Sequence, residues 1–68
     1  RSKDFKTPLV FKFNKPVNLP IHSLFVNSDF NAIWLRNGKV IDMQIVKPYQ
    51  LYVNPKEKFD TLIEIPII

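Results

Sequence analysis

Residues with chemically reactive side chains are few in this sequence and stand far apart. His22 is the single histidine, and there is no cysteine. A catalytic base needs a nucleophile and an orienting acid beside it. The nearest hydroxyl belongs to Ser23, but successive strand residues point to opposite faces. We therefore expect no catalytic residues, no enzyme activity and no cofactor.

The carboxylates are also isolated from one another. Hard cations need clustered oxygen ligands, so the spacing predicts no metal site. The residues concerned are Asp29, Asp42, Asp60 and Glu64. We interpret Glu64 as a charge on an exposed edge strand, where it would block pairing with another chain.

One cluster combines basic and aromatic side chains, in a loop bounded by Pro48 and Pro55. Its members are Lys47, Tyr49, Tyr52 and Lys56. Aromatic rings on a stiff loop bind bases, sugars or peptides at low entropic cost. In the alternative interpretation the tyrosines cover the core and keep their hydroxyls in water. The sequence predicts a non-catalytic binding or structural module, with any ligand site near residues 47–55. Its partner is left open among a carbohydrate, a peptide and a second copy.

The net charge of +4 lies entirely in residues 1–15, which hold five basic residues and one acidic residue. One alternative function is therefore nucleic-acid binding through the basic arm, by Lys3, Lys6, Lys12 and Lys15. The other interpretation is a loose, solvated arm over residues 1–7 and an edge strand protected by lysines. A further alternative is that this chain forms part of an enzyme whose catalytic residues lie outside this sequence.

The length of 68 residues predicts a single β domain over 1–68 with a small core. Without cysteine the compartment is undecided, with the cytoplasm favoured. No apolar run approaches the ~20 residues of a membrane span, so we expect no transmembrane segment.

The sequence begins at Arg1 and ends on Pro66-Ile67-Ile68. We expect the natural chain to continue, or this apolar end to pack on a partner.

The clearest structural signal is a hairpin over residues 30–46. Asn37-Gly38 between two alternating apolar runs is typical of a two-residue type I′ turn. A regular register places Trp34 opposite Ile41. The face predicted as core is then Phe30, Ala32, Trp34, Ile41, Met43 and Ile45.

Shorter elements flank this hairpin. Residues 9–13 alternate as a half-buried strand, residues 14–16 form a turn, and residues 17–26 are extended but broken by Pro20. Residues 59–65 fit a strand or a helix; the strand is favoured and turns Phe59, Thr61, Ile63 and Ile65 inward. The predicted fold is all-β: a small antiparallel sandwich or partly closed barrel of five to six short strands. Its predicted core is Phe11, Phe13, Phe25, Phe30, Trp34 and Ile41.

Several segments, taken in order, carry a resemblance to a known family: residues 9–13, 21–26, 30–35 and 36–41, then Lys47-Pro48-Tyr49 with Pro55, and last Leu62-Ile63-Glu64-Ile65-Pro66. Together they resemble a small family known as domain of unknown function 192. The chain has Asn31 and Ser23 where the family usually has Asp and Met. It also lacks the family's Arg-Gly-Leu-Met-rich opening and its tail. The resemblance implies a compact β fold and no established activity.

Overall fold

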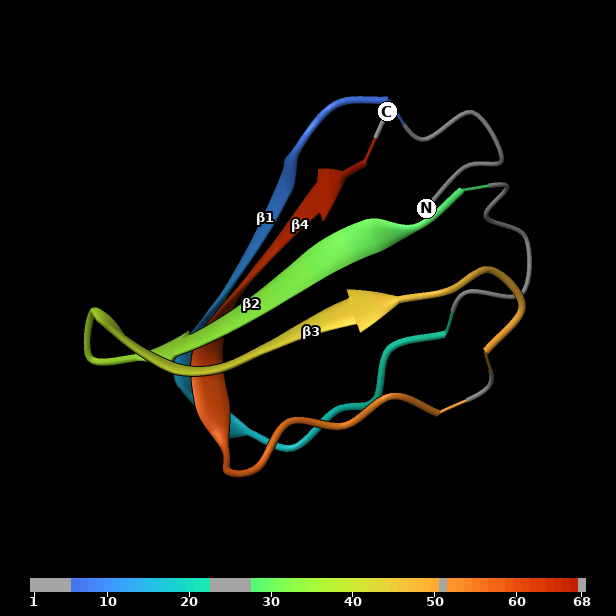
Figure 1. Ribbon diagram of the computed structural model, residues 1–68. Coiled ribbons are helices and arrows are strands. Elements are labelled where there is room, and N and C mark those ends of the chain that lie inside the picture. The colour runs from blue at the N-terminus through green and yellow to red at the C-terminus, as the bar shows by residue number, and fades with distance from the viewer. Residues whose placement is uncertain (1–5, 23–27, 51, 68) are drawn as a thin grey trace.

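One open antiparallel sheet organises the chain in the computed structural model, which describes residues 6–22, 28–50 and 52–67. Its strands are β1 (Leu9–Val17), β2 (Phe30–Arg36), β3 (Lys39–Val46) and β4 (Phe59–Pro66), in the order β1-β4-β2-β3. Figure 1 shows the four strands fanned out, without closure between the outer two. The all-β expectation is confirmed. The expected five to six strands and the sandwich or barrel are not, since the described residues form four strands in one sheet.

The hairpin of β2 and β3 turns at the predicted residues. Asn37 and Gly38 have φ values of 52° and 76°, as both central residues of a type I′ turn must. The backbone N–H of Asn37 donates to Asp60 Oδ2 at 3.0 Å. The turn is therefore braced from β4 as well as closed by its own strands.

Beyond the turn, β3 differs from the prediction because it contains a bulge. Asp42, rather than Ile41, is the Cα partner of Trp34, and each later residue of β3 pairs one position further along than predicted. A slip of one residue turns every following side chain to the other face. Two side chains predicted as core are consequently 60% exposed each: Met43 and Ile45.

The bulge is explained by what lies against β3 on its inner side. Asp42 Oδ2 accepts hydrogen bonds from the Lys56 backbone N–H and from Gln44 Nε2, both at 3.1 Å. Gln44 Nε2 also donates to the Asn54 carbonyl at 2.9 Å. Backbone groups of a packed loop need such partners. The bulge therefore turns polar side chains toward the loop and leaves Ile41 packed against the core.

β4 confirms a strand, rather than a helix, at residues 59–65. Phe59 is buried as predicted, but from Thr61 onward the faces are the reverse of the predicted ones. Leu62 and Glu64 are buried, at 7% and 0% exposure. The opposite face carries Thr61, Ile63 and Ile65. The interpretation of Glu64 as an exposed edge charge is wrong, because the last strand in sequence inserts between β1 and β2 and is interior to the sheet.

β1 is an edge strand and is longer than predicted. It continues through residues 14–16, where we expected a turn, and its register with β4 shifts between Lys12 and Val17. A proline and an irregular register are tolerated there, because an edge strand has a partner on one side only. Lys6 and Thr7 are exposed, and the rest of the predicted arm, residues 1–5, lies outside the described residues.

Two irregular segments, residues 18–22 and 52–58, cover one face of the sheet (Figure 1). Backbone hydrogen bonds of 2.9 and 3.0 Å join Ile21 to Val53, and both side chains are buried in the core. We call this side of the sheet the covered face and the other side the open face. No helix in the described ranges is long and apolar enough to span a membrane.

The core lies between the covered face and these two segments. Of the predicted core residues, Phe30 and Trp34 are fully buried, and Phe13 and Ile41 pack partly buried against them. Phe11 is 39% exposed instead, because it sits on the edge strand. The sixth, Phe25, lies outside the described residues.

Candidate functional site

The predicted binding residues of the 47–55 loop interact with different parts of the molecule. Lys47 Nζ lies 2.7 Å from Asp29 Oδ2 in an exposed ion pair, while the Lys56 backbone is held by Asp42. The two tyrosines are 64% and 68% exposed at positions 49 and 52. They do not cover the core, so the alternative interpretation given for them does not apply.

Tyr49 stands in a strained turn. Its φ is +63°, a left-handed value that costs a residue with a side chain about 1–2 kcal/mol. It follows Pro48, and the pair makes the two central residues of a turn with the proline and positive φ of type II. The Lys47 N–H donates to Gln50 Oε1 at 2.7 Å across that turn. The Tyr49 ring is thus held out from the surface by a locally costly backbone.

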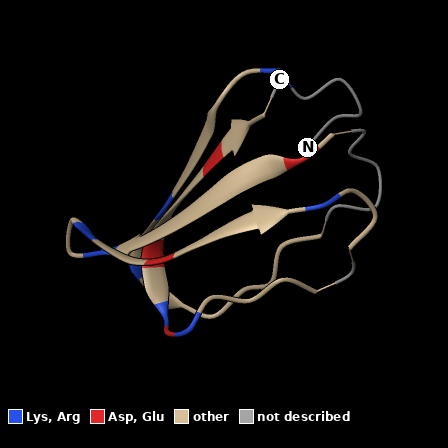
Figure 2. Cartoon of the chain, viewed as in Figure 1, with Lys and Arg blue, Asp and Glu red and all other residues tan. Residues whose placement is uncertain are grey.

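The candidate nucleic-acid residues do not gather with the other basic residues into one patch. Lys6, Lys12 and Lys15 are exposed, and Lys3 lies outside the described residues. Figure 2 shows Lys and Arg at separate places: the hairpin tip, β1, the stretch after β3 and the loop before β4. The described lysines therefore offer a polyanion scattered contacts rather than a continuous track.

A pocket of about 280 Å³ lies on the covered face. Its walls come from β1, from β4 and from the segment that follows β1. They are Phe11, Phe13, Leu19, Pro20, Ile21, His22, Phe59, Leu62 and Glu64. Phe13 and Phe59 meet edge to face, with ring centroids 5.9 Å apart, a favoured aromatic geometry. The pocket is mainly apolar, and Leu19 and Phe11 open it to solvent at 50% and 39% exposure.

Glu64 supplies the acidic group of the pocket. It is the one charged side chain among the buried residues that the structure describes, with 0% exposure. Its cross-strand partners, Leu9 and Ala32, carry no polar side-chain group. A buried carboxylate is costly unless it is hydrogen-bonded, and Glu64 does have interactions within the protein.

A second buried polar group lies close to the same wall. Trp34, the β2 partner of Leu62, buries its indole Nε1–H without an acceptor among the described residues. An unsatisfied buried donor costs about 1–3 kcal/mol. The covered face therefore combines a buried acid and a donor without a partner behind apolar walls.

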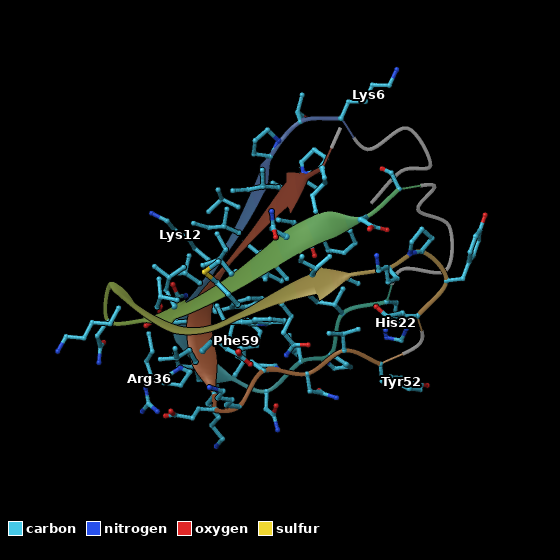
Figure 3. All side chains as sticks on the ribbon, viewed as in Figure 1. Lys6, Lys12, His22, Arg36, Tyr52 and Phe59 are labelled. Atoms are coloured by element: carbon cyan, nitrogen blue, oxygen red, sulfur yellow. The ribbon has the colours of Figure 1, made fainter. Side chains whose placement is uncertain are left out.

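The 47–55 loop reaches the pocket at its rim. His22 lines the pocket, and the ring of Tyr52 packs against it at 5.0 Å between centroids and an angle of 69°. Figure 3 shows these two labelled side chains side by side. Of the four predicted loop residues, Tyr52 is the one that contacts a pocket residue in this way.

The arrangement is suited to binding rather than to metal chemistry. No three residues among His, Cys, Asp and Glu come close enough to hold a metal ion in the described part of the chain. Sequence reasoning missed the pocket, because its walls come from three segments and Glu64 was assigned to an exposed edge. The available signal was the alternation of Phe11 and Phe13 on one strand together with Phe59 on another, which supplies aromatic walls for a site.

Comparison of the chain with protein-family models, curated proteins and solved structures gives no match. The resemblance to domain of unknown function 192 therefore stays a prediction, and the function has to be argued from the pocket itself.

Proposed function

We propose that this chain is a non-catalytic binding module whose ligand is a small aromatic or aliphatic amine. The observation that carries the proposal is the fully buried carboxylate of Glu64 in the wall of an otherwise apolar pocket. An apolar body would fill the space between Phe11, Phe13 and Leu19. Because the Glu64 side chain has no exposed surface, an ammonium group would reach it only after a wall side chain moves aside. It would then donate a charge-assisted hydrogen bond, which is stronger than the bond of a neutral donor.

The size and position of the pocket limit the ligand. A volume of about 280 Å³ lies at the lower end for ligand sites, which favours a compound with one ring. His22 and Tyr52 at the rim bring the site next to the 47–55 loop, where the sequence places it. We expect affinities from millimolar to high micromolar, because a ligand of this size has few atoms to contribute.

The test compares three ligands of one shape: phenethylamine, 2-phenylethanol and 3-phenylpropionate. Calorimetric titration should show the amine binding best, the alcohol more weakly and the acid not at all. Glu64→Gln, which keeps the shape and removes the charge, should abolish the preference for the amine. Asp29→Asn is the matched control, because Asp29 is a carboxylate on the surface, paired with Lys47; it should leave the preference unchanged.

A second variant covers the case in which Glu64→Gln does not fold. Leu19→Ala alters a pocket residue that is 50% exposed and lies outside the sheet, so folding should persist. The amine should then bind roughly three- to tenfold more weakly, through lost apolar contact. Equal binding of the three ligands, or an affinity unaffected by Leu19→Ala, would contradict the proposal.

The amine site occupies the covered face. The sandwich expected from the sequence would need a second sheet, and the face that remains for it is the open one.

A further inference from the structure

The open face of the sheet carries one wholly apolar row of cross-strand neighbours, with a mixed, mainly apolar row on each side of it. The middle row crosses all four strands through Val10, Ile63, Ile33 and Met43. One flanking row contains Ile65, Asn31 and Ile45, and the other contains Lys12, Thr61, Leu35 and Val40. A solvated face of an antiparallel sheet is normally polar. This one is mainly apolar, with Asn31 and Thr61 as uncharged polar members and Lys12 as the one charged residue in the three rows.

Several large apolar side chains on this face lie more than half in solvent. Four of them are 56–60% exposed: Val10, Val40, Met43 and Ile45. Strands about 4.8 Å apart and rows about 7 Å apart give a footprint of roughly 20 by 20 Å. The accessible surface of this region, with its three polar members included, is roughly 500–600 Å², and its apolar part lies within the range of the largest apolar patches on monomers.

We propose that the open face binds the open face of a second copy of this chain, giving a two-sheet β-sandwich with a two-fold axis. Two such faces would bury roughly 1,000–1,200 Å² in total, near the lower limit for a specific interface. The inference is independent of the amine site, which lies on the covered face.

The composition of the face favours a second copy over other occupants. A nearly uncharged face cannot select a basic or acidic partner, but it is complementary to itself, as a two-fold interface requires. The described irregular segments cannot cover it, because Ile21 and Val53 anchor them on the opposite side. Two open sheets facing each other about 10 Å apart make the standard aligned sandwich.

The primary test is sedimentation over a concentration series from about 5 μM to about 1 mM, which spans the affinities expected of a small interface. The chain should pass from monomer to dimer within this range. High salt should preserve or tighten the dimer, because each copy carries a net charge of +4 and screening reduces their repulsion. A dimer that dissociates as salt rises would contradict an apolar interface.

Two variants place a charge at opposite ends of the middle row. Met43→Lys lies on edge strand β3 and Val10→Lys on edge strand β1, and both positions are more than half exposed. Each should weaken dimerisation at least tenfold, because the two-fold axis brings the charge into the interface twice. If two copies instead paired through one edge strand of each sheet, only the variant on that edge strand would weaken the dimer. Tyr49→Lys, at a 64% exposed loop position, is the matched control and should have no effect.

The single methionine supplies a direct probe of the face. Carbon-13 labelling of the Met43 methyl group gives one resonance, which should move on dilution in the unmodified chain and stay fixed in Val10→Lys. The proposal is overturned by a monomer at about 1 mM, by a dimer that resists both charged variants, or by one that Tyr49→Lys disrupts equally.

Discussion

Deleting Ile41 tests the bulge in β3 directly. In the structure, Ile41 is the additional residue opposite Trp34, so its removal leaves Asp42 opposite Trp34 and every later pair in place. In a regular hairpin without the bulge, the same deletion would turn residues 42–46 to the opposite face. The two registers therefore predict very different stabilities for one variant.

The expected magnitude follows from the burial of the side chain that is lost. Ile41 is partly buried against the core, so its removal should cost roughly 1–2 kcal/mol, or a fall in Tm of about 5–15 °C for a domain of this size. If the hairpin had the regular register, the same deletion would move both Met43 and Ile45 out of the core and into solvent. That change would lower the free energy of unfolding by roughly 4 kcal/mol or more. That loss approaches the whole stability of ~3–10 kcal/mol expected for such a chain.

Urea unfolding followed by the fluorescence of Trp34 is a suitable assay, because this is the only tryptophan and it is fully buried. Ile41→Ala is the matched control, since it removes the same side chain and keeps the chain length. The deletion should be within about 1 kcal/mol of Ile41→Ala. A deletion variant that is unfolded, while Ile41→Ala folds, would refute the bulge and restore the regular hairpin.

Three further outcomes are expected. Gly38→Val should lower the free energy of unfolding by roughly 1–3 kcal/mol: a Cβ there meets nothing within 4 Å, so the cost is the φ of +76° alone, and an unchanged urea midpoint would contradict it. The hydrogen bond from the Asn37 N–H, followed by that from the Thr61 hydroxyl, lowers the pKa of Asp60 below its ordinary 3.8. Its contribution to stability is therefore present above pH 3.8 and lost as pH falls through the lowered value; Asp60→Asn should flatten this part of an acid unfolding curve, and an identical acid curve would count against the brace. Tyr49→Ala combined with Tyr52→Ala should cost less than about 1 kcal/mol, because both rings are more than 60% exposed, and a larger loss in thermal unfolding would show that they stabilise the fold.

Local chemistry was enough to predict the elements of this fold. The turn at Asn37-Gly38 depends on two adjacent residues that accept positive φ. The strand at 59–65 depends on its β-branched residues, which favour a pleated backbone. Both predictions are confirmed because the deciding interactions lie within a few residues of each other.

The bulge and the position of β4 could not be predicted in the same way. The bulge is favoured by Asp42 and Gln44 bonding to the loop at 54–56, a contact that no local pattern contains. The order of strands in the sheet does not follow from their order in the chain. The sequence therefore did not indicate that β4, and Glu64 with it, lies in the interior of the sheet. The pocket was missed for that reason, and of the loop predicted as the ligand site, Tyr52 reaches its rim.

The predictions for β3 and β4 each assigned side chains to the wrong face of the strand. In both strands, the apolar residues concerned lie on the same side of the sheet. The alternation predicted Met43 and Ile45 on β3 as core, and Ile63 and Ile65 on β4 as core; all four lie on the open face. Two separate strands therefore carry a pattern typical of burial on a face that this chain alone leaves open. Since the covered face obtains its own core from Phe30, Trp34 and Phe59, the chain has enough apolar residues for two layers. A second sheet over the open face would account for the alternation on both strands, and this is what the proposed dimer supplies.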